Sequence, residues 1–295
     1  MSDKIDMDKI VAKIKAKFKN DKKKADIFNT GASLKNPDNC IELPSWFQET
    51  FKIKGLPFGY IFEWAGKENS GKTSFSIQAM KAAQEQGVAV ILADSEKKTT
   101  KTRLEAWGVN PDKIGLIQPD FLEEMFDGIE EYIEHFKDTD PDCRILVVID
   151  SLGNTPSIKE MDTTNEDVMQ LGAAAKASKR GFRRLVPRLA KDQIHMLVIN
   201  QTYDNLGSHG QSRTGGKGLD FFASVIMHVN RMADIKGTSK GQEVIKGITS
   251  VWTVYKWHLF DDTGVQGRKL IVDITKDGIS PVSYTHLTLP TSDLV

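Results

Sequence analysis

The sequence has little cysteine, no net charge and no long apolar run. Its 295 residues include two cysteines, too few for a disulfide framework or a four-ligand zinc site, so we expect a reducing compartment. No window approaches the roughly 18 to 20 uncharged apolar residues that span a bilayer, and the Lys-rich start lacks the apolar region of a secretory signal. We therefore expect a cytoplasmic protein without a membrane partner.

The absence of net charge bears on the choice of partner. Lysine plus arginine and aspartate plus glutamate number 40 each, whereas nucleic-acid-binding domains are usually basic. The remaining composition is that of an ordinary globular chain, with 39% hydrophobic residues, and the length suits one large domain with an appendage. At first sight, the balance argues against a nucleic-acid partner.

The chain divides into three segments by pattern. Residues 1–24 are Lys-rich with apolar residues at helical spacing, which predicts a basic amphipathic helix, and a loop-rich linker continues to residue 50. Residues 51–281 form the main body. Residues 282–295 continue neither a helix nor a strand, and the run Val282–Thr291 resembles the translated adapter of a sequencing library. We expect this tail to be non-native and the natural protein to continue beyond Ile279.

The main body alternates short apolar runs with longer segments of helical periodicity, which is typical of an α/β fold. Continuous apolar sequences such as ILVVI and MLVI indicate parallel strands covered on both faces. The expected parallel strands are Gly59–Ala65, Val88–Ala93, Ile114–Gln118, Arg144–Asp150 and His195–Asn200. The expected helices are Lys72–Gln86, Phe121–Lys137 and Val168–Leu189. Antiparallel strands that extend the sheet are expected at Ala223–Arg231, Gly247–Leu259 and Arg268–Ile274.

A phosphate-binding loop is the most specific motif. The pattern G-x-x-x-x-G-K-[ST] is matched by Gly66, Lys67, Glu68, Asn69, Ser70, Gly71, Lys72 and Thr73, followed by Ser74. The motif follows an apolar strand and opens a helical segment, so that backbone N–H groups would face phosphate oxygens. Lys72 would reach the β- and γ-phosphates, and the Thr73 hydroxyl would bind Mg²⁺.

Polar residues at three further strand ends complete the predicted site. Asp150 ends an apolar strand and would hold Mg²⁺ through water. Glu96, just past the strand Val88–Ala93, is the candidate base that activates water, because ligands in open α/β sheets collect at the carboxyl edge. Asn200 and Gln201 follow another strand, and their amides could hydrogen-bond a terminal phosphate and register its loss.

Two loops lie after strands beside this site. The first, between Leu152 and Asn165, contains Asn154, Thr155 and Met161. The second, between Tyr203 and Gly218, is rich in glycine and basic residues, among them Arg213, Gly215, Gly216 and Lys217. Loops of this length in a compact domain tend to be functional. Cations among glycines could track the phosphates of single-stranded nucleic acid.

These motifs resemble those of the RecA recombinases of bacteria and phages. The resemblance rests on GLPFGYIFEWAGKENSGKTS from Gly55, ADSE from Ala93, VVIDS from Val147, VINQ from Val198 and TGGKGLDFFASV from Thr214. It implies a RecA-like P-loop ATPase core with a mainly parallel sheet, ATP and Mg²⁺ as ligands, and a DNA-dependent ATPase of recombination and repair. Such a protein polymerises on single-stranded DNA, pairs it with homologous duplex DNA and exchanges strands.

The resemblance also assigns roles and further partners. Lys72 and Glu96 would be catalytic, and Gln201 would sense the γ-phosphate and relay the nucleotide state together with Phe221. The N-terminal helix would be an arm that docks on a neighbouring copy. The two loops would bind DNA through Asn154, Thr155, Met161, Arg213, Gly215, Gly216 and Lys217. A loading factor and a single-strand-binding protein are candidate partners.

The chain departs from the bacterial pattern at several positions. Lys256 and His258 stand where two bacterial lysines reach the neighbour's ATP, and a histidine carries charge only when protonated. Asp220 replaces a lysine before the relay aromatic residue. Arg103 replaces a tyrosine that stacks on adenine, and its guanidinium could still stack on the base. No C-terminal regulatory domain is visible, as in compact phage-type members.

Two other classes remain open on the sequence alone. One is a P-loop kinase or small-molecule ATPase, in which the long loops would be lids over an acceptor. The other is a regulatory ATPase of the RecA superfamily that does not exchange strands. The zero net charge does not exclude the recombinase, because a polymer needs only a local basic surface on each copy, repeated along the filament.

Overall fold

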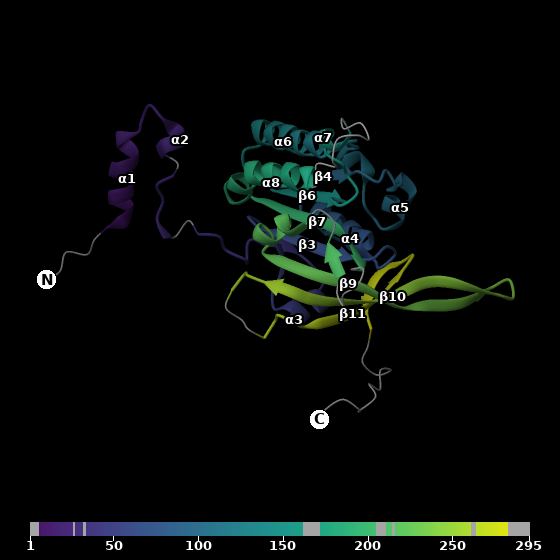
Figure 1. Ribbon diagram of the computed structural model, residues 1–295. Coiled ribbons are helices and arrows are strands. Elements are labelled where there is room, and N and C mark those ends of the chain that lie inside the picture. Colours follow the sequence, from purple (N-terminus) through teal and green to yellow (C-terminus); the bar gives the residue numbers. More distant parts are fainter. Residues whose placement is uncertain are drawn as a thin grey trace, which may run out of the picture. The chain divides into compact units, whose positions relative to one another are not determined.

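The computed structural model describes residues 6–25, 27–31, 34–161, 172–204, 211–213, 216–260 and 264–282. It divides the chain into two compact units, Met1–Asn36 and Pro37–Val295 (Figure 1). The adapter-like run falls outside the described residues except for Val282, whose backbone N–H donates to Ile271 O at 3.0 Å. Among the helices that the structure describes, none combines the length and apolarity needed to cross a bilayer.

The first unit contains two short helices, α1 (Met7–Lys17) and α2 (Lys22–Ala25). The side chain of Asp6 caps α1 by accepting from Lys9 N, and Asp21 accepts in the same way from Lys24 N before α2. The prediction of a single helix over residues 1–24 was therefore wrong, because Asp21 caps the start of a second helix. Helix α1 buries none of its residues within the unit.

The second unit is built on a large sheet with the order β12-β11-β10-β9-β3-β7-β6-β4-β5. The strands from β9 to β5 in this order run parallel to their neighbours, and those from β12 to β9 run antiparallel. The predicted α/β fold class is confirmed. The parallel strands before the extension are β3 (Ile61–Gly66), β4 (Ala89–Asp94), β5 (Ile114–Ile117), β6 (Ile145–Asp150) and β7 (Ile194–Asp204). The strands of the extension are β9 (Val225–Ser239), β10 (Gln242–Trp257), β11 (Lys269–Thr275) and β12 (Gly278–Pro281).

Helices cover both faces of the parallel strands. Side chains alternate along each strand, so that Val148 of β6 packs in one core and Val147 in the other. The Val148 core takes in α3 (Ser45–Phe51) and α4 (Lys72–Glu85). The Val147 core takes in α6 (Leu122–Thr139) and α8 (Ala173–Lys191). Smaller helices are α5 (Lys101–Ala106), η2 (Pro111–Lys113) and α7 (Ile158–Met161).

The segment assigned to a linker begins the second unit instead. Strand β1 (Cys40–Glu42) pairs antiparallel with β2 (Gly55–Pro57), and helix α3 lies between them in the chain. Phe47 and Phe51 of α3 are each 1% exposed and join the core beside α4. The predicted boundary at residue 50 therefore differs from the structure, in which the second unit starts at Pro37.

The hairpin of β9 and β10 is longer than predicted and projects from the sheet (Figure 1). Ser239 pairs with Gln242, so Lys240 and Gly241 form a two-residue turn, and both have positive φ. Such φ values favour the turn geometry that matches strand twist. The outer part of the hairpin is mostly exposed and polar. It therefore lacks the alternation of apolar and polar residues from which a strand is predicted.

Part of the second predicted loop has regular structure. Strand β8 (Gln211–Arg213) pairs antiparallel with the end of β7, and η3 (Gly216–Phe221) follows it. Residues 162–165 of the first loop, residues 166–171 after it, and residues 205–210, 214 and 215 of the second loop lie outside the described part of the chain. The start of the predicted helix Val168–Leu189 is among them.

Candidate functional site

The phosphate loop connects β3 to α4 at the carboxyl edge of the parallel strands. Gly71, the residue before α4, has a φ of +101°, which favours glycine. A Cβ at Gly71 would lie 2.2 Å from Ile274 Cδ1, and one at Gly66 would lie 2.1 Å from Val229 O. The backbone conformation favours glycine at position 71, and the Val229 carbonyl leaves no room for a Cβ at position 66. The loop leaves the first N–H groups of α4 directed toward the site.

Lys72 is held against the inside of its own loop. Its Nζ donates to Gly66 O at 2.8 Å and to Lys67 O at 2.6 Å, and the residue is 7% exposed. Burial lowers the pKa of Lys72, an effect opposed by the carboxylates of Asp150, Glu96 and Glu68. The Lys72 ammonium group is therefore bound by backbone carbonyls, which phosphate oxygens could replace.

Asp150 and Thr73 supply oxygen atoms at the base of the loop. Burial raises the pKa of Asp150 to about 6, against a hydrogen bond from the Thr73 side chain that lowers it, while the charges of Glu96 and Asp94 raise it further. A cation near Asp150 would remove this penalty on its charge. An oxygen pair of this kind fits Mg²⁺, which prefers one or two protein oxygens beside phosphate oxygens.

Glu96 collects hydrogen-bond donors from three strand ends. Its Oε1 accepts from Ser151 Oγ at 2.9 Å, Asn154 Nδ2 at 2.9 Å and Gln201 Nε2 at 2.8 Å. Its Oε2 accepts from Lys98 Nζ at 2.7 Å. Partial burial raises the pKa of Glu96, but the hydrogen bonds from Lys98, Ser151 and Gln201 outweigh it and leave the pKa below its ordinary value. The carboxylate is therefore ionised at neutral pH.

The neighbouring strand ends are joined to each other near Glu96. Asp94 of β4 pairs in register with Asp150 of β6. Just beyond, Ser95 Oγ donates to Ser151 O at 2.7 Å and accepts from Ser151 N at 3.2 Å. Asp94 accepts from Thr99 N at 3.0 Å and so fixes the turn that carries Lys98. These contacts also fix the position of Glu96 within that turn.

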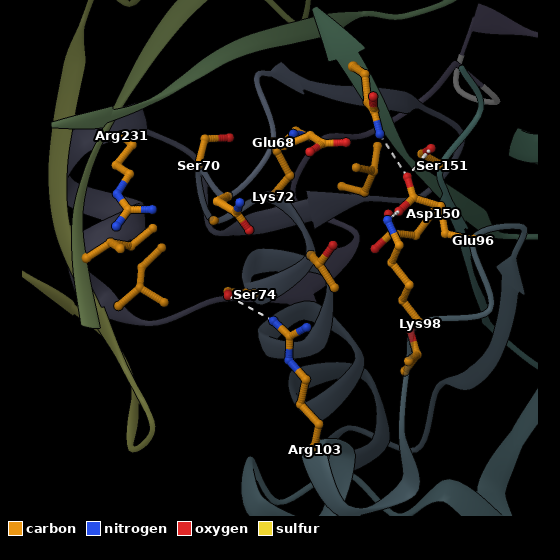
Figure 2. A pocket seen from close by; sticks show the side chains of 18 of the residues that line it. Glu68, Ser70, Lys72, Ser74, Glu96, Lys98, Arg103, Asp150, Ser151 and Arg231 are labelled. Carbon is orange, nitrogen blue, oxygen red and sulfur yellow. Dashed lines mark hydrogen bonds and ion pairs between the residues drawn. The ribbon is translucent and has the colours of Figure 1, made fainter. Parts of the chain in front are cut away.

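A cavity of about 540 Å³ opens over the phosphate loop (Figure 2). Arg103 of α5 lies at its edge, where Nη2 donates to Ser74 Oγ at 3.4 Å. Arg231 and Lys246, from the projecting hairpin, line the cavity as well. The predicted residues that line it are Glu68, Asn69, Ser70, Gly71, Lys72, Thr73, Ser74, Glu96, Arg103, Asp150 and Gln201. Gly66 and Lys67 contribute through the carbonyls that hold Lys72.

The cavity also has polar lining residues that no sequence motif predicted, among them Lys98, Ser151, Arg231 and Lys246. Lys98 and Ser151 stand within two residues of predicted site residues, so sequence proximity was the available signal. Arg231 and Lys246 arrive from the hairpin, and only the sheet order, which places β9 next to β3, brings them near the phosphate loop.

The three residues predicted to act between neighbouring copies do not line this cavity. Lys256 Nζ donates to Asp220 O at 2.6 Å and to Ala223 O at 2.7 Å, so it holds the end of η3. His258 is exposed, and its backbone N–H donates to Ser224 O. Phe221 is 80% exposed, with Lys179 Nζ 6.0 Å from its ring centroid. Phe221 thus ends η3, and Lys256 and His258 lie close to this end of the second loop.

The residues predicted to contact DNA are placed differently from one another. Asn154 is exposed and bonded to Glu96, whereas Thr155 is buried and donates to Ser151 O at 3.2 Å. Met161 ends α7 with 65% of its surface exposed. Arg213 lies in β8, and Gly216 and Lys217 begin η3, while Gly215 lies outside the described residues.

Helix α8 presents further cations that the sequence analysis did not single out. Arg184 and Arg188 of this helix pair with acids of α6. Further exposed cations of α8 are Lys176, Lys179, Arg180 and Arg183. Helix α8 contacts η3, and Lys179 Nζ lies 6.0 Å from the ring centroid of Phe221, so part of this basic surface adjoins the end of the second loop.

The strand, phosphate loop and helix, with Asp150 and Glu96 at adjoining strand ends, define a P-loop nucleoside-triphosphate-binding protein on an α/β sheet. Comparison with known proteins gives the family. The RecA N-terminal domain matches residues 9–256. The chain belongs to the RecA family.

Individual relatives agree with this assignment. Protein RecA of Fusobacterium nucleatum is 34% identical over 202 residues, which cover 67% of this chain and 52% of the relative. Protein RecA of Malacoplasma penetrans is 30% identical over 207 residues, covering 69% and 60% of the two chains. Protein RecA of Borrelia turicatae is 27% identical over 244 residues, covering 81% and 65%. The match thus spans between about half and two-thirds of these relatives.

Proposed function

We propose that the protein is a DNA-dependent ATPase of homologous recombination, which polymerises on single-stranded DNA and exchanges strands with a homologous duplex. The observation that carries the proposal is the convergence on Glu96. The candidate base accepts hydrogen bonds from Asn154, in the loop after β6, and from Gln201, where β7 leads into the second loop. A ligand that moves either loop would therefore alter the group that activates water.

The chain's own residues account for the ATP chemistry. The loop from Gly66 to Thr73 binds the phosphates, and Lys72 exchanges its carbonyl partners for phosphate oxygens. Thr73 and Asp150 hold Mg²⁺, which when bound neutralises charge on the phosphates. Glu96, ionised at neutral pH, accepts the proton of the attacking water. Arg103 at the cavity edge stacks on the base.

The DNA surface combines the two loops with helix α8. Lys176, Lys179 and Arg183 supply exposed cations on a rigid helix, and Arg213 and Lys217 belong to the second loop. Phosphate contacts of this kind release counterions, so DNA affinity falls steeply as salt rises. Neutral overall charge is compatible with this proposal because a filament needs only a local basic surface on each copy, repeated along its length.

Self-association would use the first unit and the region of η3. Met7 and Ile10 of α1 are 53% and 40% exposed and would dock on a second copy as an arm. Phe221 would relay the nucleotide state to the neighbour, and Lys256 and His258 would face the neighbour's ATP. A loading factor and a single-strand-binding protein are the further partners we propose for a filament of this kind.

The test is ATP turnover measured with and without single-stranded DNA. We expect DNA to raise turnover, filaments to be visible by electron microscopy and strand exchange to require ATP and homology. A rate indifferent to DNA would instead favour a regulatory ATPase or kinase. Lys72→Ala should abolish ATP-dependent DNA binding, and unchanged binding with and without ATP would refute the phosphate-loop assignment.

A salt titration tests the second loop separately. Replacing Arg213 and Lys217 by Ala should weaken DNA binding and reduce the slope of log affinity against log salt by about 1 for each phosphate that is no longer neutralised. The matched control replaces Lys113 and Lys269, which are exposed in other parts of the second unit, and so removes the same charge elsewhere. An unaltered slope in the loop variant would remove Arg213 and Lys217 from the DNA surface.

A further inference from the structure

The hydrogen bonds on Glu96 use the full acceptor capacity of its Oε1. Oε1 accepts from Ser151, Asn154 and Gln201, and Oε2 accepts from Lys98. An ionised carboxylate offers about two lone-pair positions on each oxygen. With three donors on Oε1, no position remains on that oxygen for the proton of an attacking water. A base that accepts the proton on Oε1 must lose a donor before it can act.

The four donors differ in how readily they can leave. Ser151 is 1% exposed and is tied to Ser95 by two hydrogen bonds. Gln201 belongs to β7, inside the central sheet. Lys98 is 71% exposed and belongs to the turn after β4, far in the chain from either long loop. Asn154 is exposed and lies in the loop that leads from β6 to α7.

The backbone around Asn154 is anchored on both sides, so its side chain is the part that can move. Leu152 N donates to Ile199 O at 3.0 Å, and Thr155 Oγ1 donates to Ser151 O at 3.2 Å. Between these anchors, Asn154 is exposed and carries a primary amide at the end of its side chain. Nδ2 of that amide can donate to a phosphate oxygen as well as to a carboxylate.

We propose that Asn154 is a positioning residue that restrains Glu96, and that nucleic acid bound at the loop after β6 withdraws its amide and frees the base. The inference rests on the proposed function, in which Glu96 activates water. It gives the first loop a direct connection to hydrolysis, separate from that through Gln201. The Asn154 amide would thus donate to Glu96 in the absence of DNA and to a phosphate when DNA is bound.

The experiment compares Asn154→Ala and Asn154→Leu with the unmodified full chain. Both substitutions remove the donor, and only the second keeps the side-chain bulk. Each should raise the ATP turnover measured without DNA by about five- to tenfold, the rate equivalent of one hydrogen bond. Turnover at saturating single-stranded DNA should stay within about twofold, so the stimulation ratio falls. Asn39→Ala removes an exposed amide that bonds Gln193 and serves as the control.

Two outcomes would overturn the inference. If turnover falls by the same factor with and without DNA, Asn154 supports Glu96 but does not restrain it. If the DNA-free rate is unchanged and affinity for a labelled oligothymidylate drops more than about tenfold, Asn154 acts through DNA contact alone. The proposed function fails separately, since it requires the unmodified protein to be stimulated by DNA, whatever the variants do.

Discussion

The Gln201 side chain donates a hydrogen bond to Glu96, with Nε2 2.8 Å from Oε1. Gln201 belongs to β7 and Glu96 follows β4, and β6 lies between these two strands in the sheet. The bond therefore connects the strand that enters the second loop directly to the candidate base. Because a hydrogen bond weakens quickly as its atoms move apart, any movement at the end of β7 would change this bond.

Gln201→Ala should reduce the response of ATP turnover to DNA. The substitution deletes the bond to Glu96 and the amide that could reach a terminal phosphate, so the ratio of the rates with and without DNA should fall by about fivefold or more. The part of the stimulation that acts through Asn154 should remain. Nucleotide affinity should change little, because Lys72 and the loop backbone remain. The control is Gln118→Ala, an exposed amide after β5 at the same sheet edge. DNA stimulation that is as large in the Gln201 variant as in the unmodified protein would contradict this role.

Glu96→Gln tests the base itself. The amide keeps the size of the side chain but cannot accept a proton, so ATP hydrolysis should slow by about 10²- to 10⁴-fold. Binding of nucleotide and of single-stranded DNA should persist, since neither depends on proton transfer. Glu131→Gln, on the exposed face of α6, provides the control. If the Glu96 variant hydrolyses ATP at near-normal rate, another group activates water.

The sequence was sufficient to predict the phosphate loop because that motif is local. Residues 66–73 are contiguous, and strand, loop and helix follow each other in the chain. Glu96 and Asp150 were also predictable, because both follow apolar runs and parallel strands bring their carboxyl ends to one edge. The positions of these residues at one edge of the sheet could thus be predicted from short-range pattern and one topological rule.

Other parts depend on contacts that the sequence does not encode locally. The bond between Asn154 and Glu96 joins residues 58 positions apart and depends on side-chain direction at two turns. The outer hairpin, exposed on both faces, lacks the alternation that predicts a strand. Residues 40–51 read as a linker because β1 and α3 are short, although their apolar residues are buried.

Asp150→Asn should stabilise the protein in the absence of nucleotide at pH 8. Burial raises the pKa of Asp150 from 3.8 to about 6, so the folded state binds the proton more tightly than the unfolded state. The charged carboxylate therefore lowers the free energy of unfolding above pH 6, by about 3 kcal/mol. Below pH 4 the group is protonated in both states and this difference vanishes.

Thermal unfolding at several pH values measures the effect. The variant should melt several degrees higher at pH 8, with a gain that shrinks as the pH falls from 6 to 4. Asp112→Asn removes an exposed carboxylate and should leave the melting temperature nearly unchanged. A constant gain at every pH would show that the stabilisation does not come from the titration of Asp150. Mg²⁺-dependent nucleotide binding should weaken in the same variant.

Gly71→Ala should damage the phosphate loop through two separable effects. The φ of +101° disfavours any residue with a Cβ, and that Cβ would meet Ile274 Cδ1 at 2.2 Å. Gly87→Ala isolates the first effect, since its φ is +67° and nothing lies within 4 Å of the added atom. The Gly87 variant should lose about 1 kcal/mol of stability and keep its nucleotide affinity.

In the Gly71 variant we expect ATP affinity to fall by about tenfold or more, the equivalent of about 1.4 kcal/mol of loop distortion. Adding Ile274→Ala removes the clash, so the double variant should regain part of the affinity relative to Ile274→Ala alone. Isothermal titration with a non-hydrolysable ATP analogue measures all four proteins. No recovery in the double variant would mean that the backbone conformation, and not contact with β11, makes glycine necessary at this position.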